Sequence, residues 1–198
     1  MLVPTDAEIR ALHHKHAPTA EAFEVVYTHC QIVCKIAEQV LAAAEPGLDA
    51  ELIRAGALLH DIGVYRLYGP DGDLDHGQYV RHGVLGYDLL GEEGFPEVIR
   101  RFCSCHVGVG LTRDDVRRRR LPLPVADYLA ESGEEKLVMY ADKFHSKTTP
   151  PTFVTATSFT AAIIRFGTDK AVAFKQMCAS FGVPDLGPLA AAYGHALV

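Results

Sequence analysis

The segment Ala57-Leu58-Leu59-His60-Asp61-Ile62-Gly63 decides the fold that we expect, because it places an imidazole beside a carboxylate at the end of a helical pattern. Adjacent helical residues point about 100° apart, so both side chains reach one point only from the rim of a helix that faces a cavity. Such a rim makes a poor core, but histidine nitrogen and carboxylate oxygen are common ligands of first-row transition metals. Since His-Asp pairs also occur by chance, the prediction depends on what the other helices contribute.

The composition is typical of a folded soluble protein. The chain has 198 residues, 48% of them hydrophobic and 22% charged, which is enough for a single well-buried domain over residues 1–198. No apolar run approaches the ~20 residues of a membrane span, so no membrane association is expected. Residues 1–6 carry neither a basic start nor an apolar run, so we see no secretory signal and expect a cytoplasmic protein.

Charge and cysteine content exclude two further classes. The net charge of −6 argues against a stable complex with nucleic acid, because such binding depends on neutralising phosphates. The five cysteines show no disulfide spacing, so reduced thiols are expected. A zinc site made of the cysteines is disfavoured, because Cys103 and Cys105 would point to nearly opposite sides of a helix. The ten histidines are the notable excess.

The hydrophobic pattern predicts an almost entirely helical chain without strands. Capping boxes at residues 5–8 and 132–135 and N-caps at Thr19 and Asp49 begin helices, and Gly63 and Gly91 end two of them. We expect helices over residues 5–12, 19–44, 50–62, 78–90, 96–106, 112–120, 134–144, 158–166 and 169–181. The turn-rich segment 68–75 is interpreted as a lid or rim, and residues 147–157 as a loop.

Two clusters of basic residues are expected at the surface. His13, His14 and His16 stand between a helix and Pro18, which indicates an exposed turn. The run 117–120 is four arginines, which we interpret as a solvated face, with contact to an anionic substrate as the alternative.

Polar side chains occupy core-facing or cavity-edge positions on several of these helices. A lone histidine there is more often a hydrogen-bonded core residue than a ligand, but an aspartate is costly to bury without a cation. Four imidazoles and two carboxylates are too many for one tetrahedral zinc and suit two octahedral ions that share a carboxylate. Asp61 is the expected bridge, with the ions ~3.5–4 Å apart. The predicted metal ligands are His29, His60, Asp61, His82, His106 and Asp142.

These residues, in this order, resemble the HD superfamily of metal-dependent phosphohydrolases. The segments LLHDIG, HGVLGYDLL, CHVGVGLT and EEKLVMYADKF are similar to the small stand-alone HDIG-type proteins of bacteria and archaea, over roughly residues 5–147. The resemblance implies an all-α HD-domain bundle of about seven to nine helices, with its core over about 19–147 and closing helices over 158–198. It also implies one metal on His29, His60, Asp61 and Asp142, with Asp61 bridging to a second metal on His82 and His106.

The chain departs from that family at one position. Many members continue the HDIG motif with Lys or His, whereas Val64 follows Gly63 here. We therefore expect the cation that binds the substrate phosphate to come from Arg66, Arg81 or Lys143.

The activity that the resemblance implies is hydrolysis of a phosphomonoester, phosphodiester or phosphoanhydride in a nucleotide or other small phosphate compound. A bridging water activated by the metals would be the nucleophile, and the expected catalytic residues are Asp61, His82 and His106. The histidine-rich set favours one or two ions of Fe, Mn, Co or Zn, with Ni or Mg as alternatives. A homodimer is left open.

Two other functions stay open. Part of the superfamily comprises mixed-valent diiron oxygenases, and the steps of 22 residues from His60 to His82 and 24 from His82 to His106 would serve either chemistry. The other alternative is an HD module that binds a nucleotide without turnover, against which the complete ligand set argues.

Overall fold

The computed structural model describes residues 3–43 and 47–198. The predicted helix end at Ala44, the break at Pro46 and the first two residues of the chain lie outside the described residues. Among the helices of the described ranges, none is long and apolar enough to cross a membrane.

Within these ranges the fold is mostly helical, as predicted. The α-helices are α1 (Asp6–His16), α2 (Ala20–Ala43), α3 (Ala50–Leu59), α4 (His82–Glu92), α5 (Glu97–Cys105), α6 (Arg113–Arg119), α7 (Gly133–Ala141), α8 (Ala156–Ile163), α9 (Thr168–Phe181) and α10 (Gly187–Tyr193). Short 3-10 helices are η1 (Ile62–Leu67), η2 (His76–Arg81), η3 (Asp142–Phe144) and η4 (Ile164–Phe166). The strands are β1 (His145–Ser146), β2 (Thr152–Phe153) and β3 (Ala196–Leu197).

Local sequence explains where several helices begin. The Thr5 and Ser132 side chains accept hydrogen bonds from the N3 amides of α1 and α7, and Glu8 and Glu135 complete the two predicted capping boxes. The Asp49 carboxylate accepts from the Leu52 amide and caps α3. Each cap satisfies an amide that the helix itself leaves without an acceptor.

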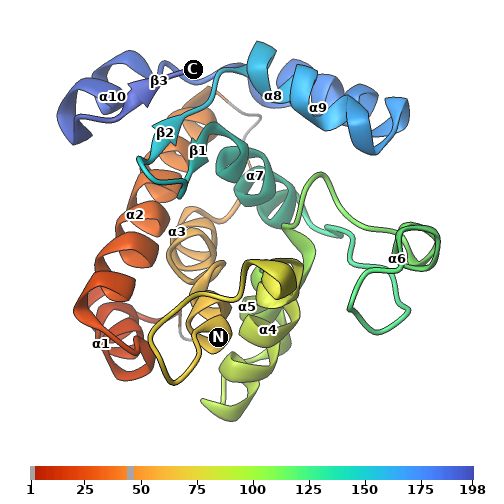
Figure 1. Ribbon diagram of the computed structural model, residues 1–198. Helices are drawn as coiled ribbons and strands as arrows, with labels where there is room; N and C mark the ends of the chain where they lie inside the picture. The colour runs from red at the N-terminus through yellow and green to blue at the C-terminus, as the bar shows by residue number, and fades with distance from the viewer. Residues whose placement is uncertain (1–2, 44–46) are drawn as a thin grey trace.

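The long helix α2 organises the packing. It lies against α3 and α7, and α4 packs against α5 and η1. In Figure 1 the C-terminal elements α8, α9 and α10 lie along one side of these helices, while α6 stands off at another. One buried apolar cluster runs through the whole arrangement and includes Ile36, Leu59, Phe102, Tyr140 and Phe174. Burial of such a side chain stabilises the fold by about 1.5–3 kcal/mol.

The predicted helix over 50–62 is too long. α3 ends at Leu59, and η1 begins at Ile62. Gly63 is not the C-terminal cap that we expected, because it serves a close approach of two backbones. A Cβ at this position would lie 2.1 Å from the carbonyl oxygen of His82 and 2.2 Å from the amide nitrogen of Gly86. The helix predicted over 78–90 is likewise divided into η2 and α4, and α4 continues past Gly91 to Glu92.

The C-terminal third contains elements that the sequence pattern did not indicate. β1 pairs antiparallel with β2, and β2 pairs parallel with β3. The segment 147–157, predicted as a loop, therefore contains β2 and the start of α8, and α10 lies in the predicted tail. Two-residue strands are too short to show an alternating pattern.

The prediction that His13, His14 and His16 lie in an exposed turn is wrong, because all three lie on α1 and His13 is buried. This side chain is fully buried, and its ring nitrogens lie 2.9 Å from the Tyr65 hydroxyl and 2.8 Å from the Leu58 carbonyl oxygen. It is a hydrogen-bonded core histidine on α1.

Candidate metal centre

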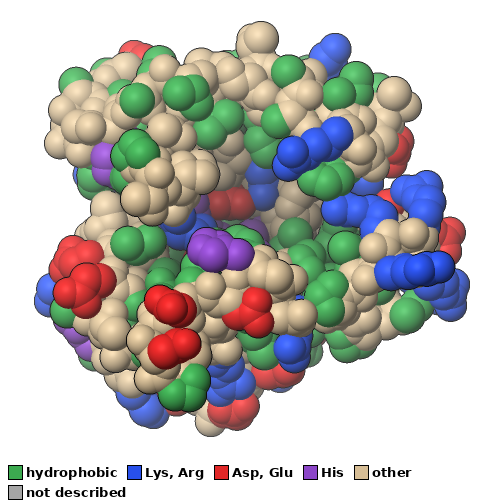
Figure 2. All heavy atoms as spheres, viewed as in Figure 1, with side chains coloured by type: hydrophobic (Ala, Val, Ile, Leu, Met, Phe, Trp, Pro, Cys, Tyr) green, Lys and Arg blue, Asp and Glu red, His purple; other side chains and the backbone are tan. Residues whose placement is uncertain are grey.

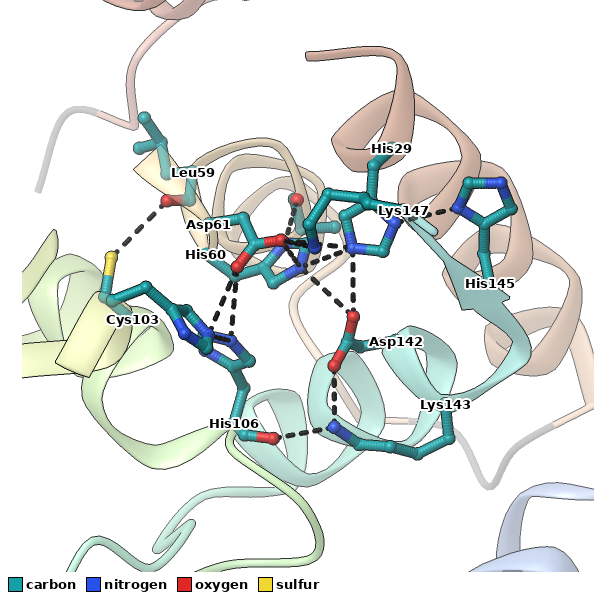
Figure 3. Close-up of polar contacts among 12 residues, drawn as sticks. His29, Leu59, His60, Asp61, Cys103, His106, Asp142, Lys143, His145 and Lys147 are labelled. Atoms are coloured by element: carbon teal, nitrogen blue, oxygen red, sulfur yellow. Dashed lines mark hydrogen bonds and ion pairs between the residues drawn. The ribbon is translucent and has the colours of Figure 1, made fainter. Parts of the chain in front are cut away.

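The six residues predicted as metal ligands come from separate parts of the chain and converge in one place. Figure 3 labels five of them, all except His82. Most of the six stand at or beside a helix end, which lets a side chain reach the centre without filling the core. The positions are His29 within α2, His60 after α3, Asp61 before η1, His82 at the start of α4, His106 after α5 and Asp142 at the start of η3. All six are buried except Asp142, which is partly buried.

Their donor atoms form two neighbouring groups. The groups are His29 with His60 and Asp142, and His60 with Asp61 and His106; within each, the ligand atoms lie within 4.8 Å of one another. The Nε2 atoms of His29 and His60 are 3.3 Å apart. Donors held about 2.0–2.2 Å from one ion lie roughly 3 Å from each other, so this spacing suits a shared ion.

A second pair of imidazoles faces the other side of Asp61. The Nε2 atoms of His82 and His106 lie 2.8 Å apart, and they are 3.3 Å and 3.5 Å from Asp61 Oδ1. On its other side, Asp61 Oδ2 lies 3.2 Å from His29 Nε2. One carboxylate therefore presents one oxygen to each imidazole pair, which is the arrangement expected of a bridging ligand.

Hydrogen bonds fix the orientation of three of the rings. The Nδ1 atoms of His60, His82 and His106 bond to the main-chain carbonyl oxygens of Ala57, Tyr79 and Phe102. A carbonyl oxygen only accepts, so each Nδ1 carries a proton, and in the neutral form of each ring Nε2 directs a lone pair into the centre. This is how proteins orient imidazole ligands toward a metal.

One ligand atom of the centre has no hydrogen-bond partner in the part of the chain that the structure describes. Asp61 Oδ1 is buried and accepts no hydrogen bond within the described residues, although two imidazole nitrogens stand near it. A buried carboxylate oxygen without a partner is costly, and so are two lone pairs that face each other. A divalent transition metal satisfies both, so the residues fit such an ion.

Electrostatics favour the metal-binding protonation state at Asp61, His82 and His106. Burial opposes ionisation of Asp61, but Lys147 and His60 outweigh it and hold the pKa of the carboxyl well below its usual value. Burial lowers the pKa of His82 to about 3 and also lowers the pKa of His106. At neutral pH these groups are an anion and two neutral imidazoles, the forms that ligate metals. At His60 burial lowers the pKa but the Asp61 carboxylate outweighs it, so the pKa is raised and a metal ion there would displace a proton.

The three cations proposed for phosphate binding lie in different places. Lys143 is buried beside the centre, where its Nζ donates to Asp142 Oδ2 at 2.6 Å and to the His106 carbonyl oxygen at 2.8 Å. Arg66 instead pairs with Glu92, and Arg66 and Arg81 line a separate hollow of about 450 Å³. The structure therefore brings Lys143 to the centre and places the two arginines away from it.

The sequence reasoning missed Lys147. Its Nζ contacts Asp61 Oδ2 and lies 5.9 Å from the centre of the Tyr79 ring. One signal was available: Val64 stands where many family members carry Lys or His, so a basic residue from another segment could have been expected to supply that cation. Lys147 stood in a stretch predicted to be a loop, so no pattern pointed to it.

His145 was also missed. Its Nδ1 lies 2.8 Å from His29 Nδ1, and its Nε2 lies 3.0 Å from His195 Nδ1. Burial lowers the pKa of His145 to about 2, so the ring is neutral and can accept the His29 proton. His145 stands three residues after Asp142, a spacing that places two helical residues on one face, which was a usable signal. Nothing marked His195 in the predicted tail.

The centre opens into a cavity of about 640 Å³, which appears in Figure 2 as a hollow between the C-terminal elements and the helices below them. Asp61, His82, His106 and Asp142 line it, together with Lys147. This volume is in the range of small-molecule sites.

The chain belongs to the HD domain family, whose model matches residues 26–147. It is 39% identical over 122 residues to an uncharacterized protein of Methanocaldococcus jannaschii, covering 60% of this chain and 65% of that one. It is also 34% identical over 125 residues to the tRNA (cytidine(56)-2'-O)-methyltransferase of Picrophilus torridus, covering 63% of this chain. The match spans less than two thirds of the first relative and only 33% of the second.

Solved structures with the same fold include the HD domain of the phosphodiesterase PgpH from L. monocytogenes. That domain has a TM-score of 0.53 and 15% identity, covering 93% of this chain and 98% of that one. Its complex with cyclic-di-AMP has a TM-score of 0.55 and 18% identity, covering 93% and 96%. At this identity the likeness concerns the fold alone.

Proposed function

We propose that the chain is a metal-dependent phosphohydrolase that acts on a small phosphate compound. The observation that carries the proposal is the position of Asp61, whose two oxygens face two imidazole pairs inside a cavity open to small molecules. In this proposal one ion is held by His29, His60, Asp61 and Asp142. The second ion is held by Asp61, His82 and His106.

The ligand chemistry supports one or two divalent ions of Fe, Mn, Co or Zn, with Ni or Mg as alternatives. Such ions, when bound, activate water and polarise a phosphoryl group. The chain itself supplies orientation. The main-chain hydrogen bonds of His60, His82 and His106 aim their lone pairs, and burial keeps bulk water from competing for them.

Two lysines complete the proposed phosphate site. Lys143 and Lys147 both line the cavity. The Lys143 ammonium group lies against the Asp142 carboxylate, and the Lys147 ammonium group lies against the Asp61 carboxylate. They can donate to phosphoryl oxygens beside the carboxylates and offset negative charge as it develops there. No protein nucleophile is required.

The comparisons support a phosphate ester as substrate. The structurally similar domain of PgpH comes from a phosphodiesterase and has been solved in complex with cyclic-di-AMP. A nucleotide or a nucleotide phosphodiester is therefore the first substrate to examine. The methyltransferase relative offers no such guide, because the match covers only 33% of it.

The test is a hydrolysis panel of phosphomonoesters, nucleotides and cyclic dinucleotides, with the wild-type chain loaded with each candidate metal. We expect hydrolysis of at least one member by the wild type, measured as free phosphate from a monoester or as the monoester product of a diester, and its loss in Asp61→Asn. Asp88→Asn, which changes an exposed aspartate on α4, is expected to keep wild-type activity. Failure to hydrolyse any member, with dioxygen uptake in the presence of an organic substrate, would contradict the proposal and favour a diiron oxygenase. Nucleotide binding without turnover would contradict it in favour of a binding module.

A further inference from the structure

One wall of the cavity comes from outside the matched family region. Residues 26–147 match the family, whereas Val154, Phe159, Ala162, Ile163 and Phe166 line the cavity from the segment that follows. We call these five residues the apolar wall. They stand on α8, η4 and the residue after β2. The face that closes the cavity is thus built by elements that follow the matched region.

Other apolar residues also line the cavity. Val25, Leu74 and Val80 line it, and Val25 is 49% exposed. Exposed valine on the rim of a cavity offers apolar surface that a ligand can cover.

Charge is confined to the end of the cavity that holds the metal ligands. Among the described lining residues, the ammonium groups belong to Lys143 and Lys147 and the carboxylates to Asp61 and Asp142. His76 lies at the exposed rim, while His82, His106 and His145 are buried at the centre. Along the apolar wall no lining side chain carries a charge.

Two arginines contact the aromatic ring at the far end of the apolar wall, although neither lines the cavity. The Arg119 and Arg165 guanidinium carbons lie 4.4 Å and 4.6 Å from the centre of the Phe166 ring. Contacts of this kind fix the position of an aromatic ring. Phe159 is supported from behind by Phe174, with ring centres 4.5 Å apart. The two aromatic rings therefore form a preorganised surface.

We infer that the substrate carries one phosphoryl group joined to a large apolar or aromatic group, which packs against the apolar wall. This inference rests on the proposed function and narrows it. A single phosphoryl group is matched by the charged end of the cavity. Further phosphates would extend along the apolar wall, where desolvation is costly and no charged side chain of the described residues lines the cavity. The guanidinium groups of Arg119 and Arg165 lie only at its far end, against the Phe166 ring.

The first experiment compares ligands that differ only in the feature under test. Equilibrium binding to the metal-loaded full chain is measured by calorimetry for 1-naphthyl phosphate against methyl phosphate, and for ATP against AMP. We expect 1-naphthyl phosphate to bind at least about tenfold more tightly than methyl phosphate, because it buries two aromatic rings. ATP is expected to bind no more than about threefold more tightly than AMP. If AMP binds more tightly than 1-naphthyl phosphate, the inference is supported and the aromatic group is a nucleobase.

The second experiment uses adjacent alanines on α8. Ala162 and Ala161 are both exposed, but only Ala162 lines the cavity within the described residues. Ala162→Asp is expected to reduce the preference for 1-naphthyl phosphate over methyl phosphate by about tenfold, with methyl phosphate binding unchanged. Ala161→Asp is expected to keep the wild-type preference.

The outcomes separate this inference from the proposed function. Equal binding of the two esters, a tenfold gain for ATP over AMP, or equal effects of the two alanine variants would overturn the inference, even if phosphate esters are hydrolysed. If no ester is hydrolysed but the naphthyl preference is present and depends on Ala162, the apolar subsite is supported and the hydrolase proposal fails.

Discussion

The Nζ atom of Lys147 contacts Oδ2 of Asp61, which stands 86 positions earlier in the chain. This ion pair joins the end of β1 to the start of η1, and the lysine side chain is 15% exposed on the cavity side. The other oxygen of the Asp61 carboxylate, Oδ1, faces His82 and His106. The lysine therefore stands at the boundary between the ligand cluster and the space that a substrate would occupy.

Replacement of Lys147 by Met should impair catalysis more than metal binding. A charged hydrogen bond to phosphate contributes about 1.5–3 kcal/mol, so we expect kcat/KM to fall about 10- to 100-fold with metal content unchanged. Steady-state kinetics and metal analysis on the same preparation provide the measurement. Lys136→Met, at an exposed position of α7, is the control. Unchanged kcat/KM in Lys147→Met would exclude a role in phosphate binding.

Replacement of Asp142 by Ala should affect one ion more than the other. Asp142 Oδ1 lies 3.0 Å from His29 Nε2 and 3.4 Å from His60 Nε2, whereas the pair formed by His82 and His106 faces Asp61. We expect the variant to retain roughly half of the wild-type metal content, since the second ion in a two-metal site keeps its ligands. Metal is measured by mass spectrometry after dialysis. Complete loss of metal, or a metal content equal to that of the wild type, would contradict the presence of two separable ions.

Replacement of His145 by Phe tests the support of His29. The aromatic ring fills the buried space but cannot accept the proton on His29 Nδ1, so the orientation of that ligand is lost. Loss of such a supporting hydrogen bond costs about 10- to 100-fold in metal affinity. Competition with a chelator measures the affinity. His145→Gln, whose amide oxygen can accept a hydrogen bond, should recover part of it. Equal affinity in both variants would argue against a supporting hydrogen bond from His29 to His145.

The stability of the chain should fall between pH 6.5 and about 4 because of His13. Burial lowers the pKa of this imidazole to about 4 in the folded state. Below pH 6.5 the unfolded chain binds a proton that the folded chain does not, so stability is full above pH 6.5 and decreases as the pH falls toward 4. The loss from this group is at most about 3 kcal/mol.

Urea unfolding of the chain at pH 7 and pH 4.5 measures this effect. His13→Gln preserves a donor toward the Leu58 carbonyl oxygen but cannot titrate, so its stability should depend less on pH than that of the wild type. His14→Gln changes the exposed neighbour on α1 and is expected to keep the wild-type dependence. If His13→Gln and the wild type lose the same free energy of unfolding, His13 is not the source.

The sequence was sufficient to predict the helical fold and most of the helix starts. Capping residues such as Thr5, Asp49 and Ser132 act over a few positions, so their effect is visible in a local pattern. Helix ends near the centre were predicted less well, because tertiary contact sets them. The contact of Gly63 with the backbone of His82 joins positions that no local pattern connects.

The same limit applies to the site. His29, His60, His82 and Asp142 could be placed from helical periodicity, and the geometry brings them together. Lys147 could not, because its approach to Asp61 depends on how the chain turns after β1. The apolar wall was hidden for a similar reason: Phe159 and Phe166 belong to predicted closing helices, and only their packing shows that they face a cavity.

The most direct test of the two-ion centre is a crystal structure of the metal-loaded wild-type chain, with anomalous diffraction recorded above and below the absorption edge of the metal. We predict two anomalous peaks ~3.5–4 Å apart, on opposite sides of the Asp61 carboxylate, with His29 and His60 at one peak and His82 and His106 at the other. A fully loaded crystal with no anomalous peak within bonding distance of Asp61 would contradict the account.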